Sequence, residues 1–369
     1  KESFVATNSR RRILIMAGGT GGHVIPALSL AHALQAKGVD VEWLGSPRGI
    51  ENRLVPNAGI MLHTIAIEGL RGKGLAGWCK APINLSRAVM QARRIIKCFK
   101  PDVVVGLGGF ASGPGGLAAR LSGVPLVIHE QNAVAGLTNK VLSRLATRTY
   151  AAFEDAFGSR AVVIGNPVRE EIAALGESPK QVAEMSNRPL RLLVVGGSLG
   201  AVALNERLPP ALAALPPERR PDVRHQAGKE RDVATAQAYT ELGIVADVSP
   251  FIDDMAAAYS WADLVVCRAG ALTVAELAAA AKPALLVPFP FAVDDHQRVN
   301  ADVLVKAGAA QCVIQSALTP ERLTQLLDEL LHPDRLAEMA SKARQAAYLD
   351  ATERLAAGCL GLVKQGETA

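Results

Sequence analysis

The sequence predicts an α/β protein made of two tandem Rossmann-like domains, each with a doubly wound parallel sheet, that face each other across a cleft. Short apolar runs followed by glycine-rich turns and helical periodicity recur along the chain, as expected for strands buried on both faces of a parallel sheet. The pattern restarts after a polar stretch at residues 166–189. At 369 residues, the chain is also too long for one ordinary core and fits two domains.

Apolar runs mark the expected strands. In the first domain they lie at residues 13–16, 39–44, 103–107, 124–129 and 162–165. In the second domain they lie at residues 190–195, 223–226, 264–267, 284–288 and 310–314. Helical periodicity predicts helices over residues 24–36 and 86–100, and one or two helices over residues 333–364. We place the domains at residues 1–166 and 167–345, with a hinge near Gly165-Asn166-Pro167.

The start of the chain has some features of a secretion signal. Arg10, Arg11 and Arg12 precede an apolar run at residues 13–17, but glycines follow at once at residues 18–22. A signal needs about 7–15 apolar residues, and a membrane span needs about 20. We therefore expect a buried strand that leads into a loop, and no segment that crosses a bilayer.

The composition is that of a globular enzyme, with 49% hydrophobic, 20% charged and 4% aromatic residues. So few aromatic residues argue against a stacking platform for nucleic acids. The five cysteines are scattered and form no CxxC pair, so neither a disulfide framework nor a zinc site is expected and a reducing cytosol is indicated. The chain contains no D-x-D sequence, and we expect no metal or other cofactor.

Charge is distributed unevenly along the chain. Residues 1–167 hold 20 Lys and Arg against 9 Asp and Glu, whereas residues 168–369 hold 20 against 26. Between Glu68 and Asp102 there is no acidic residue, and segment 70–100 mixes basic with apolar side chains. Such a segment suits an anionic membrane surface, where each Lys or Arg contributes about 1 kcal/mol. A solvated helix face is the alternative, and no nucleic-acid motif is present.

The loop at residues 18–22 follows a strand, opens a helix and places His23 near the positive end of that helix. A neutral imidazole there could take a proton from a hydroxyl, because the helix dipole disfavours the imidazolium. A histidine that only hydrogen-bonds the loop fits the sequence equally well.

Two further segments of the first domain could carry chemistry. Residues 106–111 match the dinucleotide pattern GxGxxA, and Glu130 follows near the usual spacing, which by itself suggests NAD binding. The match is weak, because this strand is not the first of its domain. His129-Glu130-Gln131-Asn132 places four polar side chains directly after an apolar strand, which favours a binding or catalytic site.

The second domain repeats these features. A glycine loop at residues 196–200 follows its first strand. Thr273-x-x-Glu276 fits a capping box, although a carboxylate at this place could instead accept the ribose hydroxyls of a nucleotide. Asp295 and Gln297 lie either in a solvated loop or in a site for sugar hydroxyls.

Taken together, these loops make the chain resemble the MurG family of N-acetylglucosaminyltransferases from Gly18 to about Glu353. The motifs that carry the resemblance are residues 18–23, 69–74, 108–114, 129–132, 165–169, 196–201, 251–255 and 268–276. The resemblance implies a metal-independent GT-B fold whose first domain binds the acceptor and the membrane and whose second domain binds UDP-N-acetylglucosamine (UDP-GlcNAc). It also implies a C-terminal helix, about residues 346–369, that packs back on the first domain.

The resemblance further implies an inverting transfer of GlcNAc to the C4 hydroxyl of the muramyl sugar in lipid I, at the cytoplasmic face of the bacterial inner membrane. Proteins of cell-wall synthesis and cell division are expected neighbours. His23 and Glu130 take catalytic roles. Substrate contacts are expected from Thr20, Gly21, Gly22, Asn132, Arg169, Ser198, Ile252, Ala271, Leu272, Thr273, Val274, Ala275, Glu276 and Gln297.

Within this set, Glu276 is expected to hold the ribose, the backbone of Ile252 to meet the uracil, and Ser198 to face the diphosphate. The chain departs from the family at Leu199, where many relatives have Gln, and at Ala269, where Ser is common. Three other functions share features of the sequence. They are a UDP-GlcNAc epimerase of the same fold, an NAD-dependent oxidoreductase and a non-enzymatic sugar-nucleotide sensor.

Overall fold

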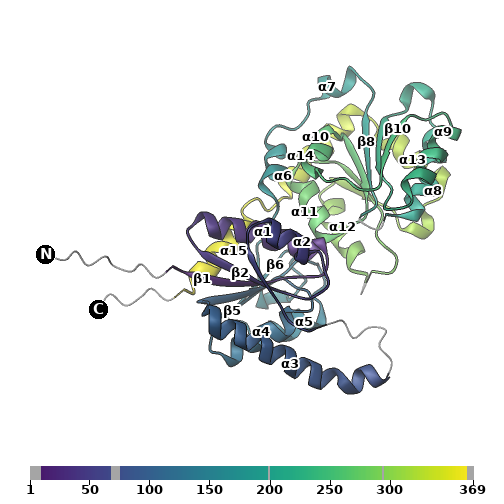
Figure 1. The fold of residues 1–369 in the computed structure, drawn as a ribbon. Helices are drawn as coiled ribbons and strands as arrows, with labels where there is room; N and C mark the ends of the chain where they lie inside the picture. Colours follow the sequence, from purple (N-terminus) through teal and green to yellow (C-terminus); the bar gives the residue numbers. More distant parts are fainter. Residues whose placement is uncertain (1–9, 68–74, 198–199, 293–294, 364–369) are drawn as a thin grey trace. The chain divides into compact units, whose positions relative to one another are not determined.

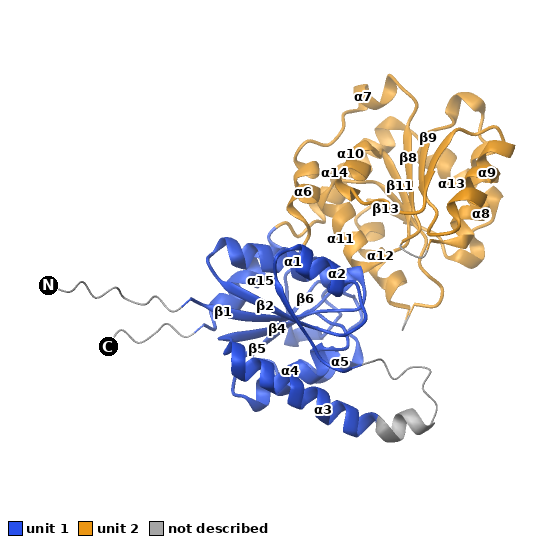
Figure 2. Cartoon of the chain, viewed as in Figure 1, with its two compact units in different colours: residues 1–167, 350–369 blue, residues 168–349 orange. Residues whose placement is uncertain are grey.

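The computed structural model describes residues 10–67, 75–197, 200–292 and 295–363, with the side chains of residues 75–80 excepted (Figure 1). The chain divides into two compact units, shown in Figure 2. Unit 1 comprises residues 1–167 and 350–369, and unit 2 comprises residues 168–349. Each unit contains one parallel sheet with helices, so the predicted fold class of two Rossmann-like α/β domains is confirmed.

Unit 1 is built on a seven-stranded sheet in the order β3-β2-β1-β4-β5-β6-β7, with every pairing parallel. Its strands are β1 (Arg12–Met16), β2 (Asp40–Gly45), β3 (Met61–Thr64), β4 (Val103–Gly106), β5 (Leu126–Glu130), β6 (Arg148–Ala151) and β7 (Val162–Val163). Its helices are α1 (Gly21–Ala36), α2 (Glu51–Asn57), α3 (Leu75–Phe99), α4 (Ser112–Leu121), α5 (Leu137–Leu142) and α15 (Ala351–Leu360). From β1, strands β2 and β3 are added toward one edge of the sheet, whereas β4 to β7 are added toward the other edge. Folds of this type bind ligands at this switch point, between β1 and β4.

The core of unit 1 lies on both faces of its sheet. Along β1, Ile13 and Ile15 pack into the cluster that includes α1 and α15, whereas Leu14 and Met16 pack into the cluster that includes α3 and α4. Alternate residues of a strand point to opposite faces, so a continuous apolar run is required when both faces are covered. Each of these fully buried side chains contributes roughly 1.5–3 kcal/mol of transfer free energy.

The C-terminal helix α15 completes unit 1, where it packs against α1 (Figure 2). Its Leu355 and Cys359 are fully buried in the same cluster as Ile13. Arg148 Nη1 donates a hydrogen bond of 2.8 Å to the carbonyl of Gly358. A side chain at Gly358 would come within 2.1 Å of the Tyr150 hydroxyl, which explains the glycine.

Unit 2 has a six-stranded parallel sheet in the order β10-β9-β8-β11-β12-β13. Its switch point, where the strand order changes direction, lies between β8 and β11. The strands are β8 (Arg191–Val195), β9 (Asp222–Gln226), β10 (Ala246–Ser249), β11 (Leu264–Cys267), β12 (Ala284–Leu286) and β13 (Ala310–Cys312). The helices are α6 (Glu170–Ala173), α7 (Val182–Ser186), α8 (Val202–Ala213), α9 (Asp232–Glu241), α10 (Met255–Trp261), α11 (Ala271–Ala279), α12 (His296–Lys306), α13 (Pro320–Leu330) and α14 (Pro333–Gln345). Leu192 and Val194 pack on one face and Leu193 on the other.

The structure adds strands that the apolar runs did not indicate, namely β3, β6 and β10. Strands β3 and β10 are edge strands with partly exposed residues, so their sequences lack a buried apolar run. The helix expected over residues 86–100 begins earlier, at Leu75. Among the described residues, no helix combines the length and apolar character that crossing a membrane requires. Of the five cysteines, the four whose side chains are described, Cys98, Cys267, Cys312 and Cys359, are free thiols.

A buried histidine connects the sheet of unit 2 to its helices. His225 on β9 lies 2.9 Å from Asn205 Oδ1 through Nε2, and 2.9 Å from the Tyr239 hydroxyl through Nδ1. Asn205 Nδ2 donates to the carbonyl of Ala227, which orients its oxygen toward the imidazole. Nε2 of His225 is therefore the donor, and Nδ1 accepts from Tyr239. Burial lowers the pKa of His225 to about 3, so the ring is neutral.

This neutral histidine predicts acid sensitivity. Below about pH 6.5, His225 binds a proton in the unfolded chain but not in the folded chain. This residue therefore lowers the free energy of unfolding by about 1.4 kcal/mol for each unit by which the pH falls. The loss continues until the pH approaches the folded pKa of about 3. His225→Gln should flatten the pH dependence of urea unfolding between pH 7 and pH 5. The exposed control His32→Gln should retain the wild-type slope, and an equally steep His225→Gln slope would contradict the assignment.

Candidate functional site

The glycine loop after β1 is held by a buried carboxylate. Glu51, the first residue of α2, is fully buried and accepts hydrogen bonds from the Gly19 N–H at 2.9 Å, the Ser46 N–H at 3.1 Å and the Ser46 hydroxyl at 2.8 Å. Gly19 itself has φ +91°, which glycine adopts readily. The charge-assisted hydrogen bonds of Glu51 thus fix the loop that leads into α1.

Close packing around Glu51 accounts for nearby glycines. A Cβ atom at Gly18 would come within 2.5 Å of the Glu51 carboxylate, and one at Gly49 within 2.1 Å. A Cβ at Gly45 would come within 2.9 Å of the Glu51 side chain. These glycines therefore make room for a carboxylate of the protein itself.

The loop after β4 packs directly on the loop after β1. Gly108 has φ +105°, and a Cβ there would lie 2.6 Å from His23 Nδ1. Gly109 has φ +90°, and its Cβ would lie 2.5 Å from the Gly18 carbonyl oxygen. The space that a pyrophosphate would need beside these glycines is filled by His23 and Gly18. The NAD interpretation of residues 106–111 is therefore not favoured.

Glu130, at the end of β5, orders the loop that follows it. Its Oε1 accepts from Asn132 N and Nδ2 at 3.0 and 3.3 Å, and its Oε2 accepts from Gly136 N and Asn139 Nδ2 at 3.3 and 2.8 Å. The carboxylate is almost completely buried. This geometry positions Asn132, and it uses both carboxylate oxygens within the loop rather than toward a ribose.

His23 lies in the first turn of α1, which begins at Gly21 rather than at Val24. Its Nδ1 lies 2.9 Å from Gln131 Oε1. The Gln131 amide nitrogen in turn lies 3.3 Å from His129 Nδ1, and His129 Nε2 lies 2.9 Å from the Gly165 carbonyl. Burial lowers the pKa of His129 to about 4, so this histidine is neutral at neutral pH.

The remaining predicted residues of unit 1 surround the same helix start. Thr20 occupies the N-cap position of α1, is exposed, and makes no side-chain capping hydrogen bond. Gly21 and Gly22 form the first residues of the helix. The structure thus brings Thr20, Gly21, Gly22 and His23 together, and it connects His23 through Gln131 to the segment that contains Glu130 and Asn132.

In unit 2, Glu276 lies on α11 and its side chain is 5% exposed. Arg169 donates through Nε and Nη2 to Glu276 Oε1 at 3.1 and 2.7 Å, and the Tyr259 hydroxyl lies 3.4 Å from Oε2. Burial raises the pKa of Glu276, while the Arg169 guanidinium opposes that rise. Burial also raises the pKa of Tyr259 well above its ordinary value, so its hydroxyl stays protonated. The carboxylate of Glu276 is thus paired with a cation, and it lies on a helix that begins just after the carboxyl end of β11.

The capping-box interpretation of Thr273 and Glu276 is wrong. Helix α11 begins at Ala271 after an N-cap at Gly270, so both residues lie within the helix instead of at its cap. The helix start therefore presents Ala271, Leu272 and Thr273 at the positive end of the helix dipole. Val274, Ala275 and Glu276 form the next turn.

Gln297 on α12 connects two loops at the carboxyl ends of neighbouring strands of the second sheet. Its Oε1 accepts from Ala269 N at 3.2 Å, after β11, and from Phe289 N at 2.9 Å, after β12. Ile252 follows β10 and packs on the apolar cluster that contains Tyr259 and Val274. Asp295, the N-cap residue of α12, forms an ion pair with Arg298 on that helix. Ser198, Leu199 and the motif at residues 69–74 lie outside the described residues.

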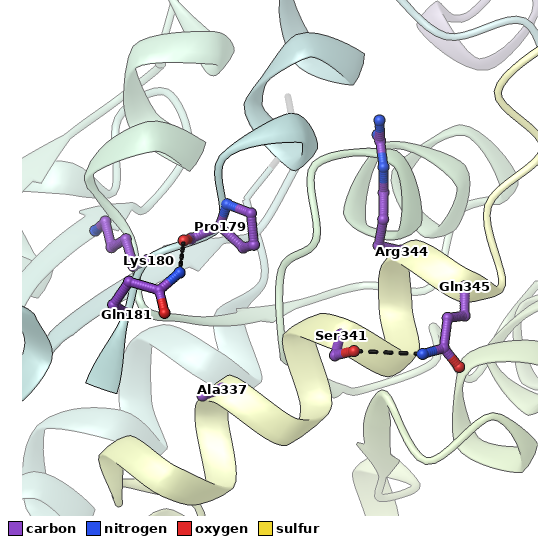
Figure 3. Close-up of a pocket in the computed structure, with 7 residues that line it drawn as sticks. All are labelled: Pro179, Lys180, Gln181, Ala337, Ser341, Arg344 and Gln345. Carbon is purple, nitrogen blue, oxygen red and sulfur yellow. Dashed lines mark hydrogen bonds between the residues drawn. The ribbon is translucent and has the colours of Figure 1, made fainter. Parts of the chain in front are cut away.

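A cavity of about 480 Å³ in unit 2 is lined by residues of α14 and of the segment before α7 (Figure 3). Its two cations are already engaged. Lys180 Nζ lies 2.9 Å from Asp263 Oδ1, and Arg344 Nη1 donates to the carbonyls of Ala173 and Ala279. None of the predicted site residues lines this cavity. Within the described ranges, no group of three or more His, Cys, Asp and Glu side chains could hold a metal ion.

Glu51, Gln131 and Tyr259 were not among the predicted site residues. Gln131 belonged to a polar segment that the sequence singled out, so proximity to Glu130 was an available signal. Glu51 and Tyr259 carried no such signal, because their partners Gly19 and Glu276 are 32 and 17 residues away. Only the packing of strands and helices brings these groups together.

Comparisons with known proteins match both units. The glycosyltransferase family 28 N-terminal domain matches residues 13–151, and the family 28 C-terminal domain matches residues 191–355. The chain is 66% identical over 350 residues to the UDP-N-acetylglucosamine--N-acetylmuramyl-(pentapeptide) pyrophosphoryl-undecaprenol N-acetylglucosamine transferase of Chromohalobacter salexigens, covering 95% of this chain and 96% of the relative.

Two further proteins support the same similarity. The transferase of the same name from Azotobacter vinelandii is 55% identical over 356 residues, which cover 95% of this chain and 99% of the relative. The crystal structure of Acinetobacter baumannii MurG is similar with a TM-score of 0.82 and 46% identity, covering 95% of this chain and 99% of that one.

The Glu51 contacts predict a structural cost of neutralisation. Glu51→Gln places an amide N–H₂ among N–H and O–H donors, so it should lower the free energy of unfolding by roughly 2–3 kcal/mol. Urea unfolding followed by circular dichroism measures this change. Glu154→Gln, an exposed glutamate of the same unit, serves as the control and should stay near wild type. A Glu51→Gln protein as stable as that control would contradict the role given to the carboxylate.

Proposed function

Because the chain belongs to the MurG family within glycosyltransferase family 28, we propose a function for the whole protein and for each of its units. The chain transfers GlcNAc from UDP-GlcNAc to the C4 hydroxyl of the muramyl sugar in lipid I, yielding lipid II and UDP. One observation carries this proposal. The similarity to transferases of that activity spans both units, and so it includes the loops of both candidate sites.

Unit 2 is the donor-binding unit in this proposal. Glu276 accepts the ribose hydroxyls, Arg169 lies beside the nucleotide, and the backbone of Ile252 meets the uracil. The diphosphate lies at the start of α11, where residues 271–273 occupy the positive end of the helix dipole. Support comes from the buried, oriented carboxylate of Glu276 and from Gln297, which fixes the loops after β11 and β12 beside that helix.

Unit 1 is the acceptor-binding unit. Thr20, Gly21, Gly22 and Asn132 surround the incoming hydroxyl, and His23 is the general base. The acceptor oxygen forms a bond to the anomeric carbon while the bond from that carbon to the diphosphate oxygen breaks, and its electron pair leaves with UDP. The hydroxyl proton passes to His23. Configuration inverts, and the sugar has oxocarbenium character in the transition state.

The leaving diphosphate gains negative charge in this step. Helix starts and oriented N–H groups stabilise such charge without reorganisation, which lowers the barrier. Glu130 acts by ordering the loop that carries Asn132, as its hydrogen bonds with Asn132 N and Nδ2 indicate. A UDP-GlcNAc epimerase would need no acceptor pocket, and neither that alternative nor a sensor is favoured over the transferase.

Release of UDP tests the proposal directly. The purified chain should release UDP from UDP-GlcNAc only when a lipid I analogue is present, should form a disaccharide product, and should do so in EDTA. Because a positioned base contributes about 10²–10⁴-fold, His23→Ala should lower kcat by that factor and change the KM for UDP-GlcNAc little.

His32→Ala is the matched control, because His32 is an exposed histidine of the same helix. Its kcat should equal that of the wild type. Donor binding without acceptor-dependent release would overturn the transferase assignment. A His23→Ala enzyme with wild-type kcat would overturn the role of His23 alone.

The exposed side of α3 supports peripheral attachment to an anionic membrane at the cytoplasmic face. Ala88, Ala92 and Ile96 form the buried stripe that packs in the core. The exposed side carries apolar and basic side chains, namely Ile83, Leu85, Arg87, Met90, Arg93, Arg94 and Lys97. Such surfaces bind anionic membranes in two ways: apolar side chains insert into the interface, and neighbouring cations pair with the lipid headgroups. Association with proteins of cell-wall synthesis and division is part of the same proposal.

Vesicle binding checks this surface. Replacing Arg87 and Arg94 together by alanine should lower partitioning onto vesicles that contain an anionic lipid by roughly 10- to 30-fold, because each cation contributes about 1 kcal/mol. Kinetics with a soluble acceptor analogue should be unchanged. Arg322→Ala, an exposed arginine of unit 2, should not alter partitioning. Equal binding of the double variant and the wild type would contradict the assignment of α3.

A further inference from the structure

A chain of hydrogen bonds runs from the backbone of Gly165 to the imidazole of His23. His129 Nε2 is 2.9 Å from the Gly165 carbonyl oxygen, His129 Nδ1 is 3.3 Å from Gln131 Nε2, and Gln131 Oε1 is 2.9 Å from His23 Nδ1. Both His129 and Gln131 are buried, with 0% and 1% exposure. Water therefore has little access to these groups, and each must find its partner within the protein.

The Gly165 carbonyl determines the direction of this chain. A carbonyl oxygen can only accept, so His129 carries its proton on Nε2. Because burial lowers the pKa of His129 to about 4, the ring is neutral and its Nδ1 is an acceptor. Gln131 must then turn its amide nitrogen toward His129. The same nitrogen also lies 3.3 Å from the His129 carbonyl oxygen, a second group that can only accept.

With its nitrogen toward His129, Gln131 presents its oxygen to His23. That oxygen can only accept, so Nδ1 of His23 must carry a hydrogen. In a neutral imidazole the lone pair is then on Nε2. We infer that Gln131, oriented by His129 and the Gly165 carbonyl, is a positioning residue that holds His23 in the Nδ1–H tautomer and makes Nε2 the proton acceptor. This inference rests on the role of His23 as base in the proposed function.

Two further contacts hold the amide and the ring in place. Asn166 Nδ2 donates to the Gln131 carbonyl oxygen at 3.0 Å, which fixes the backbone from which the amide extends. On the other side, Gly108 lies against the His23 ring so closely that a Cβ would come within 2.6 Å of Nδ1. The ring is thus confined between a glycine and an amide.

The neutral amide has a chemical consequence. A carboxylate at position 131 would also accept from Nδ1, but it would stabilise the imidazolium that forms after proton transfer. Glutamine fixes the same tautomer with no net charge. His23 is therefore oriented to accept the hydroxyl proton, while the protonated ring receives no ion-pair stabilisation from residue 131 and can release the proton to solvent after transfer.

The tautomer can be measured in the native protein without any substrate. The full chain is labelled with ¹⁵N-histidine, and the His23 signals are assigned by their loss in His23→Ala. Long-range ¹⁵N–¹H spectra at neutral pH should show a protonated Nδ1 and an unprotonated Nε2 for His23, and the opposite pattern for His129. A His23 that is protonated mainly on Nε2 would overturn the inference.

Gln131→Met removes the hydrogen bonds of the Gln131 side chain to His23 and His129 while keeping a side chain of similar length. It should lower kcat at least about tenfold, and at most by the roughly 10²–10⁴-fold that a positioned base contributes, and should change the KM for UDP-GlcNAc less than twofold. The Nε2–H tautomer of His23 should rise in the same protein. Gln131→Glu, which keeps an accepting oxygen toward His23, should retain the Nδ1–H tautomer. The exposed control Gln35→Met on α1 should match the wild type in all three measurements.

These outcomes separate the inference from the proposed function. A Gln131→Met enzyme with wild-type kcat and an unchanged His23 tautomer would overturn the inference, whatever the substrate. If His23→Ala retained full turnover while the native spectrum showed the Nδ1–H tautomer, the base assignment would fail and the hydrogen-bond chain would stand as the device that orients the ring.

Discussion

The contact between the loops that follow β1 and β4 determines the geometry of the candidate site in unit 1. These strands are neighbours in the sheet, and their connections leave in opposite directions, so the loops meet at the switch point. Gly108 and Gly109 allow the second loop to lie against His23 and the Gly18 carbonyl. A side chain at Gly108 would displace His23, and with it the 2.9 Å contact to Gln131, whereas one at Gly109 would displace the Gly18 backbone. The position of the proposed base thus depends on two backbone conformations.

Buried polar groups around that contact keep it in place. Glu51 accepts from the first loop, Glu130 from the loop after β5, and Gln131 bridges two histidines. A buried carboxylate loses its hydration, and only several good hydrogen bonds make up for that loss. Each of these two carboxylates accepts bonds from backbone N–H groups. A loop movement that left one of these buried acceptors without its donors would raise the free energy of the folded protein. These hydrogen bonds therefore favour one ordered arrangement of the loops.

Unit 2 uses a different device for its carboxylate. Glu276 is paired with Arg169 and faces the protonated Tyr259 hydroxyl, so its two oxygens have different partners. In the proposed donor complex, ribose hydroxyls and Arg169 share this carboxylate. Pairing with Arg169 also opposes the rise in pKa that burial causes. In the proposed complex, the same arginine can therefore limit the rise in the pKa of Glu276 before the nucleotide arrives and contact the nucleotide afterwards.

The sequence determined the fold class, because uninterrupted apolar runs such as residues 13–16 form strands only where both faces of a sheet are covered. It also located the polar loops at strand ends, and through them the family. It did not indicate β3 or β10, since edge strands need no apolar run, and it left a capping box open as one interpretation because Thr273 and Glu276 have the spacing of a cap. Only tertiary structure joined Glu51 to Gly19, Tyr259 to Glu276 and Gln131 to His23, contacts between groups 32, 17 and 108 residues apart. Local patterns record which face of an element is buried, whereas the partner of a buried polar group is decided by which strands become neighbours in the sheet.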